Sequence, residues 1–300
     1  MDTSFIALSG SGGEGATADF GSHRIALGES TIELNCRASG PRDASLCLVC
    51  LHAVGHDQED YAGTHGLPGV RVLSFDWPGH GGSSADQTPA STERYAEVAE
   101  QLLSTLDEAA GKRRYVLLGN SIGGAVALRL ATRSPIASKI AGLVVIDAGG
   151  LVPMGAKERA FCRAFAWAYR AASRGGLARR VLPWWYSRMY RRLLVGPDAA
   201  ARRDAIVAAG LQRAPVLSQA WRSFAAPEAT VIPHCTEVRV PTLVCWARSD
   251  PFNALSASLP AIRSIPHHHL AVFEGGHAPH VEQPERFREV LLEYLDALRQ

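Results

Sequence analysis

The chain has 300 residues, of which 47% are hydrophobic and 20% are charged, and its formal net charge is +2. This apolar content is enough for a buried core, which excludes a disordered chain, and the length suits two domains or one large α/β domain. No apolar run reaches the roughly 20 residues that a membrane-spanning helix needs, and the first residues lack a basic leader. We therefore expect a cytoplasmic protein without membrane spans.

Residues 1–20 are rich in glycine, serine and alanine and are predicted to form a flexible tail. Beyond the tail, short apolar runs that resemble strands buried on both faces alternate with helical patterns. The strand-like runs are residues 46–51, 70–75, 115–119, 143–147, 242–246 and 270–273. Apolar residues at helical spacing lie between Tyr95 and Leu106 and after Pro284. The alternation predicts an α/β fold with a mostly parallel central sheet flanked by helices, whose chemistry lies in the loops after the strands.

Residues 153–235 interrupt this alternation and are predicted to form a helical cap, inserted into a core of residues 21–152 and 236–300. The segment has no clear strand-like run and contains four of the six tryptophans. Basic side chains concentrate in it, because residues 157–223 hold fourteen basic and three acidic residues. Such a charge partition indicates either an acidic substrate, partner or surface, or a solvated outer face of amphipathic helices.

The strongest chemical signal is the segment Gly119–Gly124, which reads Gly-Asn-Ser-Ile-Gly-Gly and lies between a strand-like run and a helical stretch. A G-x-S-x-G motif in this context is typical of a nucleophile elbow. The flanking glycines relieve crowding in a strained turn, and the turn exposes the serine hydroxyl. Ser121 is therefore the predicted nucleophile, and a glycine-rich turn with an incidental serine is the alternative.

A serine nucleophile needs a base within hydrogen-bond reach and a group that orients this base. His277 follows the last strand-like run in a glycine-containing loop and is the expected base, with His280 as its rival. Asp250 follows the run 242–246 and precedes a proline, which favours it as the orienting acid. Asp147, at the end of the preceding run, is the competing acid.

Acyl transfer also needs hydrogen-bond donors for the developing oxyanion. The predicted donors are the backbone N–H of Ile122, directly after the nucleophile, and that of Val54, in the loop after residues 46–51. His80 is expected to anchor a neighbouring loop. The histidines do not follow a known metal-binding motif, so we predict no metal and no cofactor.

Five segments together resemble one known family. They are Leu51-His52, Asp76-x-Pro-Gly-His-Gly-x-Ser83, Gly119–Gly124, Ser249-Asp250-Pro251 and Gly276–Pro284. This set is similar to the motifs of the α/β-hydrolase fold superfamily. The resemblance implies a serine hydrolase with a helical cap between strands six and seven, and it puts Ser121, Asp250 and His277 at the triad positions.

The family comparison also shows departures. Ala53 stands where family members usually have a glycine after the histidine. Asn120 before the serine resembles the meta-cleavage-product C–C hydrolases, but Ala278 stands where those enzymes typically have a tryptophan.

We therefore predict a cofactor-free serine hydrolase that cleaves a carboxylic ester or related acyl substrate through an acyl-enzyme. The alternatives are a C–C bond hydrolase with the same triad and a non-catalytic binding protein on the same fold. The expected partner is a small acyl molecule, anionic or carrier-bound if the arginines contact it, and not a nucleic acid. Trp184, Trp185 and Asn120 are the candidate substrate-binding residues. The oligomeric state is left open.

Overall fold

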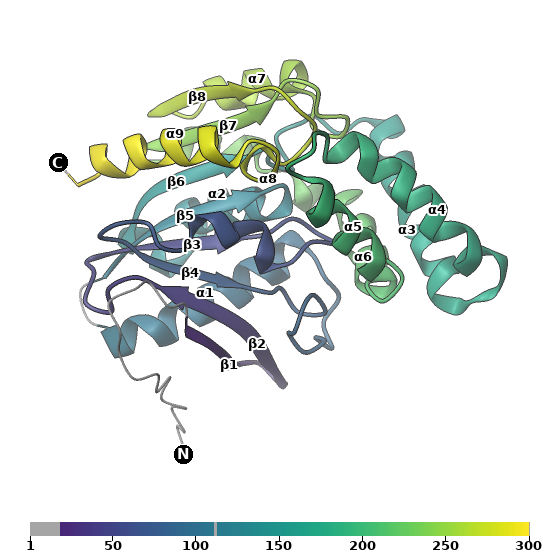
Figure 1. Cartoon of the computed structure of the whole chain (residues 1–300), viewed down its shortest axis with the longest axis horizontal. Coiled ribbons are helices and arrows are strands. Elements are labelled where there is room, and N and C mark those ends of the chain that lie inside the picture. The colour runs from purple at the N-terminus through teal and green to yellow at the C-terminus, as the bar shows by residue number, and fades with distance from the viewer. Residues whose placement is uncertain (1–18, 111–112, 300) are drawn as a thin grey trace.

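The computed structural model describes residues 19–110 and 113–299. Its centre is an eight-stranded sheet with the order β1-β2-β4-β3-β5-β6-β7-β8 (Figure 1). The β1–β2 and β2–β4 pairs are antiparallel, and the remaining pairs are parallel. The strands are β1 (Asp19–Leu27), β2 (Ser30–Ser39), β3 (Leu46–Leu51), β4 (Arg71–Phe75), β5 (Arg114–Asn120), β6 (Ile140–Ile146), β7 (Thr242–Ala247) and β8 (His268–Phe273).

Each of the six predicted strand-like runs overlaps one of the parallel strands β3 to β8. The interior strands of this set have apolar side chains on both faces, and β6 is buried at all seven of its positions. β1 and β2 are not among the predicted strands. Their exposed and buried residues alternate, and many of them are polar. The predicted tail lies outside the described residues, apart from Asp19 and Phe20, which belong to β1 instead.

Helices cover both faces of the sheet and create two apolar clusters. Along β3, Val49 and Leu51 face one cluster while Leu48 and Cys50 face the other, as the two-residue period of a strand requires. The first cluster includes residues of α1 (Thr92–Ala110) and α2 (Ile122–Arg133), and the second includes α9 (Pro284–Ala297). The shorter elements are η1 (Gln58–Thr64), η2 (Pro135–Lys139), η3 (Pro227–Ala229), η4 (Ile232–Glu237), α7 (Leu255–Arg263) and α8 (Pro279–Glu282).

Between β6 and β7 the chain forms four helices, which lie beyond one end of the sheet (Figure 1). They are α3 (Ala156–Arg174), α4 (Gly176–Leu193), α5 (Ala200–Ala209) and α6 (Ala214–Phe224). We refer to residues 153–235 as the helical insertion. Its buried side chains form a third cluster that also takes in Val54, Phe252 and Ala278 from loops of the sheet. Among the helices that the structure describes, none has the length and apolar character needed to cross a membrane.

Candidate active site

The turn between β5 and α2 holds Ser121 in a strained conformation. Its backbone has φ 56° and ψ −116°, a region that non-glycine residues rarely occupy. Glycines on either side make the turn possible. A Cβ at Gly119 would collide with the carbonyl of Gly123, and a Cβ at Gly123 would collide with the carbonyl of Leu51. The turn thus has the geometry of a nucleophile elbow, with Ser121 at the N-terminus of α2.

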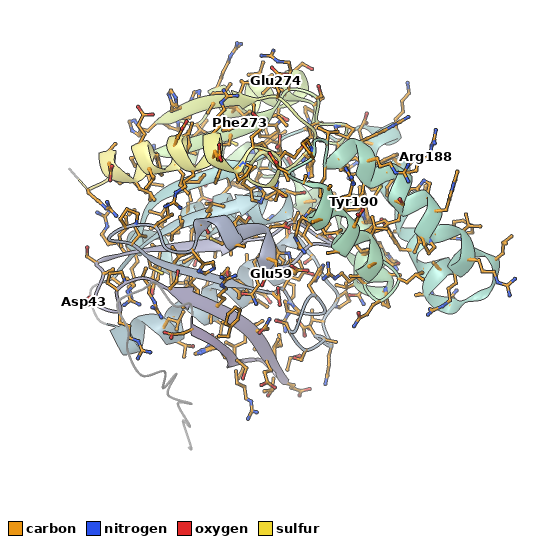
Figure 2. All side chains as sticks on the ribbon, viewed as in Figure 1. Asp43, Glu59, Arg188, Tyr190, Phe273 and Glu274 are labelled. Atoms are coloured by element: carbon orange, nitrogen blue, oxygen red, sulfur yellow. The ribbon has the colours of Figure 1, made fainter. Side chains whose placement is uncertain are left out.

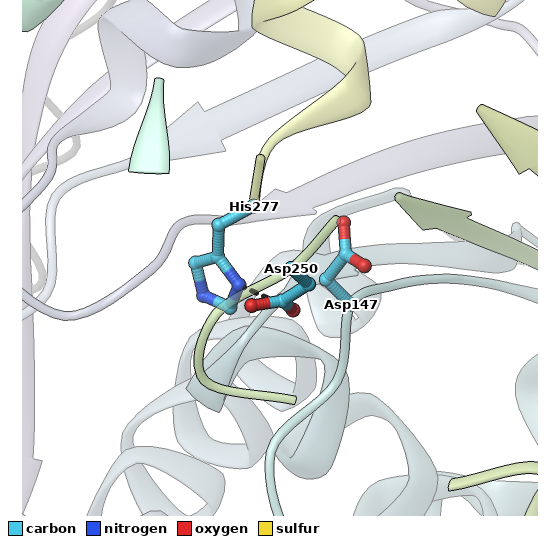
Figure 3. A group of neighbouring side chains, drawn as sticks. All are labelled: Asp147, Asp250 and His277. Atoms are coloured by element: carbon cyan, nitrogen blue, oxygen red, sulfur yellow. Dashed lines mark hydrogen bonds and ion pairs between the residues drawn. The ribbon is translucent and has the colours of Figure 1, made fainter. Parts of the chain in front are cut away.

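The loops after β7 and β8 bring Asp250 and His277 together (Figure 3). His277 Nδ1 lies 2.7 Å from Asp250 Oδ2, and both side chains are buried. The other carboxylate oxygen of Asp250 accepts a hydrogen bond from the backbone N–H of Phe252 at 2.8 Å. Asp250 therefore fixes the orientation of the imidazole with a proton on Nδ1, which leaves Nε2 for proton transfer.

The same pair determines the protonation of the histidine. Burial alone would lower the pKa of His277. The charge of Asp250 and its hydrogen bond outweigh burial and raise the pKa of His277 to about 9. The imidazolium is therefore strongly favoured beside Asp250, as the charged intermediate of a proton-transfer cycle requires.

Asp147, the competing acid, lies next to this pair in a different environment (Figure 3). Its Oδ1 accepts the backbone N–H of Ala247 at 2.8 Å, while its Oδ2 is buried with no hydrogen-bond partner among the described residues. Burial and then the charge of Asp250 raise the pKa of Asp147 well above its usual range, which favours the neutral acid. The imidazole hydrogen bond goes to Asp250, not to Asp147.

One oxygen or nitrogen from each of Asp147, Asp250 and His277 lies within 4.8 Å of the others, a spacing that a cation could use. The Nδ1 of His277 and the Oδ2 of Asp250 are, however, already joined by a hydrogen bond. A metal at this point would compete with that bond for both atoms. The absence of a metal from the working protein stays a prediction.

The rival histidine, His280, is buried in α8 against Tyr61, with ring centroids 4.9 Å apart in a stacked arrangement. Burial lowers the pKa of His280 to about 4, so the ring is neutral. Neither ring nitrogen has a hydrogen-bond partner among the described residues. Of the two histidines, only His277 lines the cavity that contains Ser121.

The two predicted oxyanion donors belong to residues that line the same cavity. Val54 and Ile122 both contribute to its wall, and within the described residues neither N–H donates a hydrogen bond. The N–H of Gly55 does have a partner, because it donates to His80 Nε2 at 3.0 Å. His80 thus anchors the loop between β3 and η1. Ala53 fits this loop because the positive φ, +83°, falls at Gly55 instead.

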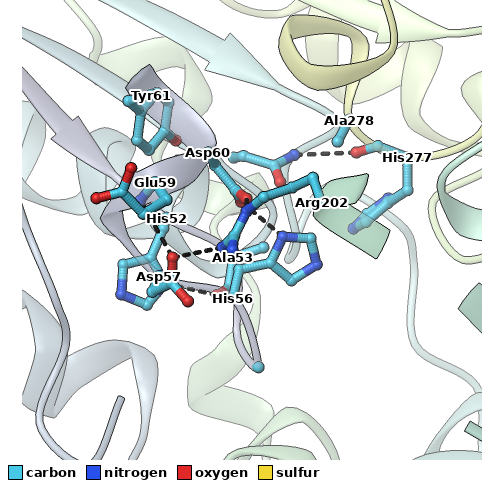
Figure 4. A network of polar contacts seen from close by, with 12 residues as sticks. His52, Ala53, His56, Asp57, Glu59, Asp60, Tyr61, Arg202, His277 and Ala278 are labelled. Carbon is cyan, nitrogen blue, oxygen red and sulfur yellow. Dashed lines mark hydrogen bonds and ion pairs between the residues drawn. The ribbon is translucent and has the colours of Figure 1, made fainter. Parts of the chain in front are cut away.

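A network of charged side chains joins this loop to the helical insertion (Figure 4). Arg213, just before α6, donates to the carbonyl of Gly55 and, at 2.7 Å, to Asp57 Oδ2. Arg202 in α5 donates to Asp57 and, at 2.6 Å, to Asp60 Oδ1. Hydrogen bonds to both carboxylates and to a backbone carbonyl hold the loop from the side of the insertion.

His56 belongs to the same network and also lines the cavity. Its Nδ1 lies 2.6 Å from Asp60 Oδ2. Burial would raise the pKa of Asp60, but the charges of His56 and Arg202 outweigh burial and lower it, so Asp60 is ionised. No sequence motif predicts this cluster, since its arginines lie 142 and 156 residues from their acidic partners.

The cavity has a volume of about 470 Å³ and lies between the sheet and the helical insertion. Ser121 and His277 are part of its wall. Among the described residues, only Lys157 and Glu158 bring a Lys, Arg, Asp or Glu side chain to the wall. Most of the remaining wall is apolar or aromatic, including Met154, Phe161, Tyr169, Met189, Leu217, Trp221, Phe224 and Phe252. This size and lining are typical of a site for a small, largely apolar molecule.

The three predicted substrate-binding residues lie outside the wall of this cavity. Trp184 is 67% exposed, and Trp185 packs against Phe165 with ring centroids 4.9 Å apart. Asn120 is buried and its amide donates to the carbonyls of Ile146 and His277, so it supports the histidine loop. None of the three belongs to the cavity wall, and none of the arginines of the helical insertion does. Composition alone does not show which helix face of the insertion is turned inward.

Comparison with known proteins agrees with this architecture. A thermophilic esterase from Thermogutta terrifontis, whose structure is solved, superimposes with a TM-score of 0.76 at 21% identity, covering 93% of this chain and 100% of the esterase. The poly(3-hydroxyalkanoate) depolymerase of Ectopseudomonas oleovorans is 26% identical over 233 residues, which are 78% of this chain and 77% of the depolymerase.

A third relative is the 2-hydroxy-6-oxononadienedioate/2-hydroxy-6-oxononatrienedioate hydrolase of Burkholderia vietnamiensis. It is 26% identical over 287 residues, covering 89% of this chain and 93% of that hydrolase. The sequence pattern of the alpha/beta hydrolase family matches residues 48–290, most of the chain from β3 into α9. With this match, the sheet order and the turn at Ser121, the chain belongs to the alpha/beta hydrolase family.

Proposed function

We propose that this hydrolase is a cofactor-free serine esterase. The observation that carries the proposal is a shared cavity, which Ser121 in its strained turn and the Asp250-bound His277 both line. Val54 and Ile122, whose N–H groups have no hydrogen-bond partner among the described residues, line it as well. A nucleophile, an oriented base and two donors are the parts that acyl transfer requires. The helical insertion covers the side of the cavity that lies opposite the sheet and acts as a cap.

In the proposed reaction, Ser121 Oγ attacks the ester carbonyl carbon while His277 Nε2 accepts the hydroxyl proton. The N–H groups of Ile122 and Val54 donate to the oxyanion that forms. The C–O bond to the alcohol then breaks, and His277 returns the proton to the departing alkoxide. Water, deprotonated by the same imidazole, attacks the acyl-enzyme and releases the carboxylic acid and Ser121.

The lining of the cavity supports a mainly neutral, apolar acyl substrate. Lys157 is the one Lys or Arg side chain that the described residues bring to the wall. An anion would therefore find one cation there, next to the carboxylate of Glu158. A neutral ester would bury its acyl group against the apolar side chains.

A C–C hydrolase with the same triad is the second candidate, favoured by the nearly full-length match to the dienedioate hydrolase. The substrate name of that relative implies two carboxylates, for which the cavity wall offers few charged partners. We therefore place ester cleavage first.

The test uses the purified protein with a fluorophosphonate probe, a series of p-nitrophenyl esters and a meta-cleavage diketone. We expect a covalent adduct on the peptide containing Ser121 and ester turnover that exceeds diketone turnover. Ser121→Ala and His277→Ala should each lower kcat by about 10⁴-fold or more. Ser104→Ala, in α1, is the matched control and should keep wild-type turnover.

Three results would overturn the proposal. Near-normal ester turnover by Ser121→Ala would show that another group is the nucleophile. Faster cleavage of the diketone than of every ester would assign the same triad to C–C hydrolysis, and no adduct and no turnover at all would indicate a binding protein.

A further inference from the structure

The outer face of α4 carries an exposed apolar and basic stripe. Leu177, Val181, Trp184, Arg188 and Arg191 follow one another at intervals of three or four residues and fall within an arc of about 80° on a regular helix. All five are exposed, with exposed fractions of 75% for Leu177 and 67% for Trp184. The opposite face packs inward through residues such as Leu182 and Tyr186. Figure 2 shows Arg188 on the outer surface of the insertion.

The adjacent helix α3 repeats this pattern. Arg163, Trp167, Arg170 and Arg174 are exposed and lie within an arc of about 60°. Trp167 is 72% exposed. The opposite side of α3 faces inward, where Cys162, Ala166, Tyr169 and Ala172 are buried. Two packed helices therefore each present a tryptophan among arginines to the outside.

Basic side chains of this hairpin greatly outnumber acidic ones. Residues 156–193 contain ten basic residues and one acidic residue. Within the described part of the chain, none of the eight exposed arginines of residues 156–193 forms an ion pair; they are Arg163, Arg170, Arg174, Arg179, Arg180, Arg188, Arg191 and Arg192. Elsewhere on the protein, arginines such as Arg94 and Arg129 are paired with acids. An excess of unpaired positive charge is thus concentrated where the large apolar side chains are exposed.

We propose that the outer face of the α3–α4 hairpin docks this protein on an anionic lipid surface. Tryptophan prefers the boundary between lipid headgroups and acyl chains, and arginine binds the phosphate groups of anionic lipids. An amphipathic helix with this composition lies in the plane of the membrane with its apolar side chains among the acyl chains. Docking is peripheral and requires no membrane-spanning segment.

The positive charge of the docking face favours a lipid surface over a second copy of the chain as its partner. A two-fold symmetric dimer would bring the same basic face of each copy together, and these like charges would repel without acids between them. Exposed Leu177, Val181 and Trp184 side chains favour an acyl layer over a polyanion without an apolar phase, such as a nucleic acid.

The hairpin that carries the docking face also contributes to the cavity wall. Phe161 in α3 is 45% exposed and also belongs to the cavity wall, so the cavity reaches the surface next to this hairpin. Docking as proposed would leave the inner face of α4, with Tyr186 and Tyr190, in its place in the cavity wall. The lipid-binding proposal does not depend on the proposed reaction.

The experiment measures cosedimentation of the whole protein with sonicated vesicles of phosphatidylglycerol and, separately, of phosphatidylcholine. We expect binding to phosphatidylglycerol that weakens with added salt, a blue shift of tryptophan fluorescence, and little binding to phosphatidylcholine. Arg188→Glu combined with Arg191→Glu should weaken the partition coefficient by about tenfold or more. Leu177→Ser combined with Trp184→Ser should weaken it similarly and remove most of the blue shift.

Matched controls are Phe20→Ser and Arg24→Glu, which change exposed residues of β1 on the sheet. Both should bind vesicles like wild type, and circular dichroism melting should show that every variant is folded. The proposal is wrong if wild type does not bind phosphatidylglycerol, or if the α4 variants bind as well as the β1 variants. A dimer in analytical ultracentrifugation that the Trp184 variant dissociates would identify a second copy as the occupant instead. Tighter binding to duplex DNA than to vesicles would identify a nucleic acid.

Discussion

Asp147 and Asp250 are neighbouring carboxyl groups with different hydrogen-bond partners. The Asp250 carboxylate accepts from His277 and Phe252, whereas the Asp147 carboxyl group accepts only from Ala247 among the described residues. Asp250→Asn should therefore lower kcat for a p-nitrophenyl ester by about 10⁴-fold, because the amide favours the wrong tautomer of the imidazole. Asp147→Asn keeps an oxygen for Ala247 and should lower kcat by less than about tenfold. An equal or larger loss in the Asp147 variant would transfer the orienting role to that residue.

The pH dependence of the reaction follows from the same pair. A general base works in its neutral form, and Asp250 raises the pKa of His277 to about 9. In the wild type, kcat/KM should therefore rise with pH through an apparent pKa above the ordinary histidine value of about 6.5. Asp250→Asn removes the negative charge, so the pKa of His277 falls and the rise should move to lower pH. Rates measured from about pH 5 to pH 10 check this, and an unshifted profile in the variant would contradict it.

At the residue scale, sequence motifs identify the candidate catalytic residues, and contacts in the structure distinguish between the two candidate histidines. The glycines around Ser121 are visible in the sequence because the turn leaves no room for a Cβ. The choice between His277 and His280, three positions apart, depends on which ring enters the cavity. That depends on the start of α8, which the sequence does not reveal.

At the scale of elements, α5 and α6 hold the loop that carries Val54. Arg213 is the direct link, because it donates both to the carbonyl of Gly55 and to Asp57. Arg213→Met should misplace the Val54 N–H and lower kcat by about tenfold to 100-fold, with KM changed by less than about threefold. Steady-state kinetics, measured below the melting temperature of the variant, determine kcat and KM separately.

Arg222→Met is the matched control for this variant. Arg222 lies in α6 as an exposed residue without an ion pair among the described residues, so its loss should leave kcat unchanged. Arg213→Lys keeps the charge but not the forked geometry and should fall between the two. If Arg213→Met raised KM and left kcat intact, the arginine would serve substrate binding rather than the position of the loop.

The elements of the sheet differ in how readily a sequence reveals them. β3, β5, β6 and β7 contain continuous apolar runs because helices cover both faces of the sheet and neighbouring strands pair with both of their edges. β1 lies at the edge of the sheet, and Ile25 is its one fully buried residue. A polar, alternating edge strand is hard to distinguish from a loop without knowledge of its partner.

At the scale of the whole molecule, the helical insertion and the sheet loops share one apolar cluster. The interruption of the strand–helix alternation predicts where the insertion begins and ends. It does not predict which side chains face the cavity, since the sequence does not distinguish the buried from the exposed tryptophans of the insertion. Packing distinguishes them: Trp221 is 9% exposed and lines the cavity, while Trp184 is 67% exposed on the outside.

This difference leads to a prediction about substrate length. Trp221 packs against Phe165 and Phe252, with ring centroids 4.5 Å and 5.4 Å apart, and its loss would enlarge the cavity. Trp221→Ala should raise the ratio of kcat/KM for the octanoate ester to that for the acetate ester by about tenfold, at a cost of about 3–5 kcal/mol in the free energy of unfolding. Trp184→Ala, in the same insertion, should leave the ratio for these soluble esters and the melting temperature close to wild type. The ratio is measured with p-nitrophenyl esters below their aggregation limits. If both variants changed it equally, or if only Trp184→Ala did, acyl groups would bind on the outer face of the insertion and not in the cavity beside Ser121.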